Sequence, residues 1–261
     1  MNNQEIIKSL EALIEALKAE EQEEVTTFDF GNGPVPAHRH KNPDGSIGGW
    51  VANTATVADT AYIWENAQVY GNAQVLGKAW VYGDARVFGG AQVYGNAQVF
   101  DNAQVLGKAW VYGDARVFGG AQVYGDARVF GNAQVYGNAK VLGKAQVTVN
   151  AYVSDNAYVS DNAKVSGNAR VYDNAHVYGN AYVSGDAWVA GKAWVFGGAL
   201  VYGNARVLGN AQVYGNAQVL GKAQVYENAR VFGNAHVYGN AQVLGKAWVT
   251  DEVVVNIGEV K

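Results

Sequence analysis

A six-residue period governs most of this chain. Alanine stands at every sixth position from Ala55 to Ala247, and valine follows two residues after each alanine, with Ile63 as the one exception. Positions i and i+2 of a strand lie on the same face, so alanine and valine share an apolar face. The residue between them is Gln, Arg, Trp, Tyr, Lys or His in most repeats, which is typical of a solvent-facing position. The period therefore predicts one half-buried strand in every repeat.

Glycine and asparagine mark the turns between these strands. Each valine is followed by a large residue, usually Tyr, Phe or Leu, then in most repeats by glycine and by Asn, Asp or Gly. Such residues tolerate the positive φ of a sharp turn, which explains why the chain holds 33 glycines. A single strand and turn cannot bury an apolar face, so each unit must stack on copies of itself. The sequence predicts a solenoid.

The repeats VYGNAQ, VLGKAW and VYGDAR resemble those of the hexapeptide-repeat, left-handed parallel β-helix family. In that family three hexads make one triangular coil of about 18 residues. The resemblance implies an all-β fold, a single left-handed parallel β-helix of about eleven coils. The lead-in GGWV at 48–51 is similar to the start of bacterial and phage hexapeptide-repeat proteins, and implies a cap. Tyr70, Phe88 and their equivalents depart from the small or acidic residue common in that family, so the corners should be aromatic.

We expect four segments along the chain. They are an amphipathic α-helix at 1–24, a linker and N-terminal cap at 25–50, the solenoid at 51–255 and a C-terminal tail at 256–261. Within the cap, Trp50 is expected to cover the end of the alanine and valine core.

An apolar stripe defines the expected helix. Its residues follow 4-3-4 spacing: Ile6, Leu10, Leu13 and Leu17. The stripe either packs on the end of the solenoid or forms a short coiled coil that mediates self-association or binds a protein partner. Both alternatives remain open from the sequence.

Composition excludes several classes of function. The chain has no cysteine, so disulfides and thiolate metal sites are excluded. Residues 1–54 hold four basic and nine acidic side chains, and no basic patch indicates nucleic-acid binding. Charges interrupt the first twenty residues, and no apolar run could span a bilayer. We therefore expect a cytoplasmic protein that does not contact membranes.

An internal duplication bears on whether the solenoid has a special face. Residues 67–96 and 97–126 agree at 27 of 30 positions. Thirty residues are five hexads, which is not a whole number of three-hexad coils, so each copied hexad lies on a different face of a triangular solenoid from its original. The fold tolerates such a shift only if the three faces are nearly equivalent. The outward tryptophans also indicate equivalent faces, because they are divided among all three. The first face has Trp80 and Trp188, the second has Trp110, and the third has Trp194 and Trp248.

No catalytic or cofactor-binding residue is predicted, and no cofactor. His176 and His236 occupy ordinary outward positions. His38 and His40 are weak candidates for a metal site in the one non-repetitive loop. The favoured interpretation is a non-catalytic rod or scaffold. The resemblance leaves an acyl-CoA-dependent acyltransferase as one alternative, and the surface aromatics leave glycan or partner binding as another.

Overall fold

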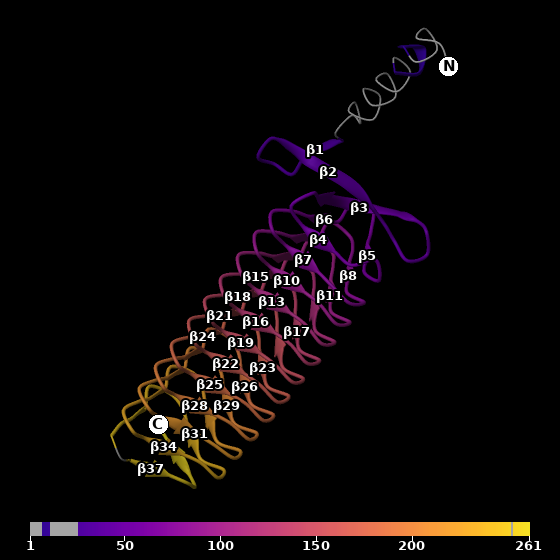
Figure 1. Ribbon diagram of the computed structural model, residues 1–261. Coiled ribbons are helices and arrows are strands. Elements are labelled where there is room, and N and C mark those ends of the chain that lie inside the picture. Colours follow the sequence, from indigo (N-terminus) through magenta and orange to yellow (C-terminus); the bar gives the residue numbers. More distant parts are fainter. Residues whose placement is uncertain (1–6, 11–25, 252) are drawn as a thin grey trace.

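The computed structural model describes residues 7–10, 26–251 and 253–261. The chain winds into a long β-solenoid, with a β-hairpin cap at one end and the C-terminus at the other (Figure 1). Residues 7–10 are helical, and the rest of the predicted helix at 1–24 lies outside the described residues. Among the helical residues that the structure describes, no segment has the length and apolar character needed to cross a membrane.

Short strands recur with the period of the sequence. The cap contains β1 (Thr27–Asp29), β2 (Pro34–Lys41) and β3 (Ile47–Ala52). From β4 (Thr56–Val57) to β36 (Trp248–Val249) each strand has two residues and starts six residues after the last. The final strands are β37 (Val254–Val255) and β38 (Glu259–Val260).

Every third strand belongs to the same sheet, so the solenoid has three walls. One sheet runs from β1, β2 and β3 through β6 to β36, the second from β4 to β37 and the third from β5 to β38. Strands in the solenoid pair in parallel with an offset of 18 residues, as Gln92 does with Trp110. Among the strands of the described residues, only the pairs β1–β2 and β2–β3 are antiparallel. The predicted triangular coil of three hexads is confirmed.

The solenoid is longer by about one coil than the count of alanines indicates. Each wall contributes twelve parallel rungs, with β3 as the first rung of one wall and β37 and β38 as the last rungs of the others. Val243 pairs with Val260, only 17 residues later, because the last turn is one residue short. The predicted tail at 256–261 thus contains a rung. At the usual strand spacing of about 4.8 Å, the solenoid is roughly 50 Å long.

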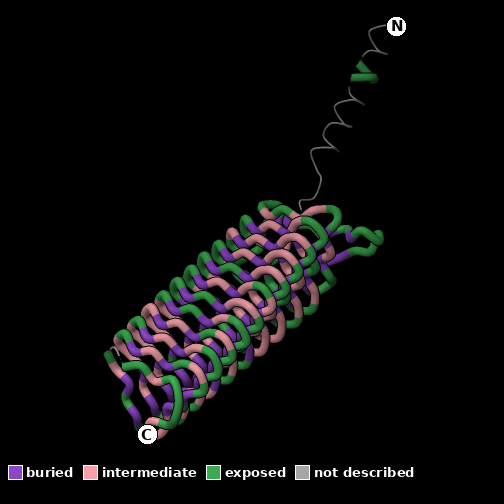
Figure 2. Tube along the Cα trace, turned by 90° about the horizontal axis from the view of Figure 1, so that it is seen from below, coloured by how far each residue is buried: buried purple, intermediate pink, exposed green. Residues whose placement is uncertain are grey.

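Alanine and valine fill the interior on all three walls. Apart from the terminal coils, these side chains are almost completely inaccessible to solvent, and the buried positions repeat along the whole length (Figure 2). Backbone hydrogen bonds join successive coils, and the amides of Gln92, Tyr94 and Asn96 donate to carbonyls one coil later at 2.8–3.0 Å. The same core and the same ladder therefore recur at every rung.

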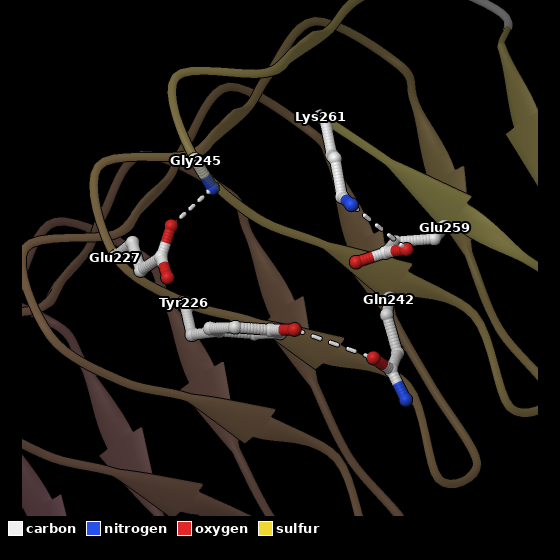
Figure 3. A network of polar contacts seen from close by, with 6 residues as sticks. All are labelled: Tyr226, Glu227, Gln242, Gly245, Glu259 and Lys261. Atoms are coloured by element: carbon white, nitrogen blue, oxygen red, sulfur yellow. Dashed lines mark hydrogen bonds and ion pairs between the residues drawn. The ribbon is translucent and has the colours of Figure 1, made fainter.

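From Gly71 to Asp251 the turns have left-handed backbone at one position in each repeat. Glycine fills it in most repeats, as at Gly95 (φ 75°). Asp251 fills it in the last such turn with φ 27°, and aspartate or glutamate fills it at five earlier turns: Asp101, Asp155, Asp161, Asp173 and Glu227. Their carboxylates compensate by accepting a backbone amide of the next coil, and Glu227 accepts from Gly245 at 2.7 Å (Figure 3). Val149, with φ 64°, has no such side-chain acceptor.

The cap adds two antiparallel strands to one wall. Trp50 pairs with Gln68 and lies on the outer side of β3, stacked on Phe28 with ring centroids 4.6 Å apart. The prediction that Trp50 covers the core end is wrong, because side chains alternate along a strand and the inward residue is Val51. The glycines of GGWV allow close approach instead: a Cβ on Gly49 would lie 2.2 Å from the Ala67 carbonyl oxygen.

Candidate functional site

The outward tryptophans are distributed among the walls as predicted. Trp80 and Trp188 lie in the β5–β38 sheet, Trp110 in the β4–β37 sheet, and Trp194 and Trp248 in the third. Arginines one coil away cover some of these rings. The Arg128 guanidinium lies 5.0 Å from the centre of Trp110, and those of Arg206 and Arg170 lie 4.9 and 5.3 Å from Trp188. Trp194 and Trp248 remain 43% and 64% exposed.

The aromatic corners form stacks that run along the solenoid. Neighbouring rings lie nearly parallel with centroids 4.6–4.9 Å apart. The longest stacks are Tyr82–Phe100–Phe118–Tyr136 and Tyr178–Phe196–Tyr214–Phe232. Their spacing equals the separation of the rungs, so stacking follows directly from the fold. Most of these rings are half-buried, and they stabilise the coils as well as form the surface.

Asparagine ladders run beside the aromatic ones. The Asn150 amide donates to Asn168 Oδ1 at 3.1 Å, and Asn168 donates to Asp186 Oδ1 at 2.9 Å, each across one coil. The six-residue period indicated turn residues here but gave no sign of these side-chain bonds. They become visible in the sequence only when it is written in rows of 18, because the partners are then neighbours in one column.

A polar belt interrupts the aromatic corners in the middle of the solenoid. Thr148, Ser154, Ser160 and Ser166 replace large corner residues there. Beside Ser154 lies a hollow of about 450 Å³, lined by Tyr136, Tyr152, Ser154, Asp155, Arg170, Tyr172 and Trp188. Burial raises the pKa of the Tyr172 hydroxyl, and Asp173 adds to this effect. This hollow is the best candidate site on the solenoid walls, because four aromatic side chains line it together with a cation and an anion.

Two further hollows have simpler linings. One, of about 400 Å³, lies on the β4–β37 wall among Lys108, Trp110, Asp126, Arg128, Lys144 and Gln146. The other, of about 430 Å³, is mainly apolar and lies between the cap and the first coil, beside Phe30, Val35, Pro36 and Tyr70.

The histidines of the cap have separate environments. A bulge between Arg39 and Lys41 breaks the alternation along β2, so His40 is buried whereas His38 is exposed. His40 Nε2 lies 3.1 Å from the Ala61 carbonyl oxygen, which requires the nitrogen to carry a proton. Asn42 Oδ1 accepts the Ile63 amide at 2.9 Å. These two side chains satisfy the backbone groups that a preceding coil would otherwise bind.

This capping role differs from the predicted metal site. His38 Nδ1 lies 3.0 Å from Asn53 Oδ1 and does not share the contacts of His40. In the described part of the chain, no three His, Cys, Asp or Glu side chains gather as metal ligands. Burial lowers the pKa of His40, the hydrogen bond to the Ala61 carbonyl partly offsets this, and His38 lowers it further.

The two solenoid histidines lie on different walls. His176 lies between Tyr158 and Trp194 of the adjacent coils, with ring centroids 5.5 and 5.7 Å away, and burial lowers its pKa. His236 pairs with Gln218 and Val254 on the β4–β37 wall. The predicted helix residues Ile6, Leu13 and Leu17 lie outside the described residues, whereas Leu10 is helical and exposed.

Comparison with known families agrees with this geometry. Eight segments match the family model described as YdcK Beta solenoid repeat: residues 67–83, 79–95, 91–113, 121–135, 163–179, 199–215, 211–227 and 223–239. The chain is a β-solenoid repeat protein. The matched segments lie before and after the polar belt, and the segment 163–179 includes its last residue, Ser166, so the same type of repeat builds both halves of the solenoid. A search of curated proteins finds no match to the chain.

Proposed function

We propose that this β-solenoid protein is a non-catalytic, rigid rod of the left-handed hexapeptide-repeat class, which serves as a spacer or scaffold. The observation that carries the proposal is the equivalence of its three walls. Each wall has twelve rungs. Apart from the end rungs and Ile63, each rung buries the same alanine and valine and is bonded in the same way to the next. Each coil contacts mainly its neighbours, so the stiffness of the rod depends on the three hydrogen-bonded ladders that join every coil to the next.

We propose that residues 1–24 attach the rod to another copy of the chain or to a protein partner. Ile7 and Leu10 in the described helical piece are 53% and 52% exposed, and the sequence continues the apolar stripe to Leu13 and Leu17. An exposed apolar stripe of this spacing is typical of a helix that pairs with another helix. We therefore propose that this segment mediates self-association or docks a protein partner.

Analytical ultracentrifugation of the full chain tests the attachment. A triple variant, L10E/L13E/L17E, should sediment as a monomeric rod, while the unaltered chain forms an oligomer. The control K8E/K18E changes charge in the same segment but leaves the apolar stripe intact, and it should retain the oligomer. Identical sedimentation of the triple variant and the unaltered chain would exclude self-association through this segment.

Calorimetry with acetyl-CoA tests the non-catalytic assignment. Hexapeptide acyltransferases bind that cofactor, so a rod without an active site should show no stoichiometric heat of binding. Saturable binding, accompanied by acyl transfer that is lost in H176A or H236A, would replace the proposal with the acyltransferase alternative.

A further inference from the structure

One ring is missing from an aromatic stack at the edge of the β5–β38 wall. Tyr136 ends a continuous stack, and its neighbour Phe118 lies 4.9 Å away. The next coil has Ser154 at the corner, and the coil after that has Tyr172. Ser154 is the one corner position in the solenoid where a single small residue separates two aromatic residues. The gap is therefore one rung high.

Tyr172 keeps the orientation of a stacked ring although both adjacent corner residues are small. Its centroid lies 6.2 Å from that of Trp188, with 77° between the planes. Tyr178 has the same distance and angle to Trp194, and Tyr178 is stacked on Phe196. Two rungs at about 4.8 Å each separate Tyr172 from Tyr136. A planar ring midway between them would have the offset-stacked spacing seen elsewhere along the corners.

The gap between Tyr136 and Tyr172 is lined by a positive charge, Arg170, as well as by aromatic rings. Ser154 forms its floor and is 5% exposed. The Arg170 guanidinium lies 5.7 Å from the centre of Tyr152 and 5.3 Å from that of Trp188. Asp155 is engaged, because its carboxylate accepts the Ser154 hydroxyl at 3.0 Å and the Asp173 amide at 3.3 Å. Within the described residues the one ion pair joins Lys261 to Glu259, so Arg170 has no carboxylate partner there.

We propose that this hollow binds a planar aromatic ring that carries a carboxylate or a similar small anionic group. The ring takes the place of the missing rung between Tyr136 and Tyr172, and the anion pairs with Arg170. The volume of about 450 Å³ is within the range of small-molecule sites. This assigns a ligand to a surface that the rod function does not use, so the two proposals stand or fall separately.

Ligand-observed NMR on the full chain, with benzoate as the probe, tests the site. A fragment of this size should bind with a Kd of about 1 mM. Cyclohexanecarboxylate carries the same charge on a thicker, non-planar ring and should bind at least tenfold more weakly. Methyl glucoside represents the sugars that exposed aromatics can also bind, and it should be weaker than benzoate.

The most direct test is a substitution that fills the gap with a side chain of the protein itself. Ser154→Phe supplies the missing ring, so benzoate affinity should fall at least tenfold while the melting temperature stays the same or rises. Ser166→Phe is the matched control, because its corner neighbours Thr148 and Ser184 are also small. It should leave benzoate binding unchanged. Arg170→Gln should weaken benzoate but not p-cresol, which has the ring without the carboxylate.

Tyr172→Ala provides a second route if Ser154→Phe perturbs folding. Small residues already stand at Ser154 and Ala190 on the same corner, so the coil tolerates the change, and benzoate binding should be lost. Undiminished benzoate binding in Ser154→Phe or Tyr172→Ala would overturn the site. Equal loss in Ser166→Phe, stronger binding of methyl glucoside, or no benzoate binding at tens of millimolar would do the same.

Discussion

Truncation of one valine on each wall measures whether the walls contribute equally to stability. Val123, Val129 and Val135 are successive core valines, and each is fully buried. Each lies between two other valines of its own wall, and Val123, for example, pairs with Val105 and Val141. Substitution by alanine removes two buried carbon atoms, worth about 1.6 kcal/mol by transfer, and leaves a cavity that raises the loss to about 2–3 kcal/mol.

Denaturant unfolding at 25 °C, monitored by circular dichroism, provides the assay. The free energy of unfolding should fall by the same amount in V123A, V129A and V135A, within about 0.5 kcal/mol. Gln122→Ala, at the outward position beside Val123, should change it by less than about 0.5 kcal/mol. A valine whose truncation costs less than about 1 kcal/mol, or twice as much as the others, would refute the equivalence of the walls.

Two further predictions concern the turns and the cap. Val149→Gly should stabilise the protein by up to about 1 kcal/mol, because the left-handed strain on a β-branched residue exceeds the added entropy of glycine in the unfolded chain; a lower denaturation midpoint would contradict this. Burial lowers the pKa of His40 from its ordinary value of 6.5, so the folded state favours the neutral imidazole. The free energy of unfolding gained in this way is fully present above pH 6.5. It is lost as the pH falls toward the lowered pKa. Melting temperatures of the unaltered chain and of H40Q, which keeps a donor for Ala61 without titrating, should therefore diverge between pH 7.5 and 5, with the unaltered chain losing more; parallel curves would exclude a role for His40 titration.

The fold was predictable from the sequence because the six-residue repeat, and the two-residue spacing of alanine and valine within it, are so regular. A repeat of six with alanine and valine two residues apart fixes which side of each strand is buried, and the resemblance supplied the three strands per coil. The ends were less predictable. Trp50 alternates outward, the bulge in β2 separates His38 from His40, and the short turn before Glu259 adds a last rung that lacks the alanine signal.

The candidate site depends on neighbours 18 residues apart, which a six-residue reading does not compare. Ser154 is unremarkable within YVSDNA, where a polar corner simply ends a hexad. Only when Tyr136 and Tyr172 are placed above and below it does the missing ring become visible. The position of Arg170 between Tyr152 and Trp188 depends on side-chain packing across coils, and the sequence pattern carries no signal for it.

Comparison of two deletions tests the interchangeability of the hexads most directly. Removing residues 109–126 takes out one whole coil and leaves every later hexad on its own wall. Removing 121–126 moves every later hexad onto the preceding wall. If the walls are equivalent, both proteins should unfold cooperatively, with melting temperatures that differ by no more than about 4 °C. Cooperative unfolding of the 18-residue deletion, together with loss of folded structure in the six-residue deletion, would contradict the account.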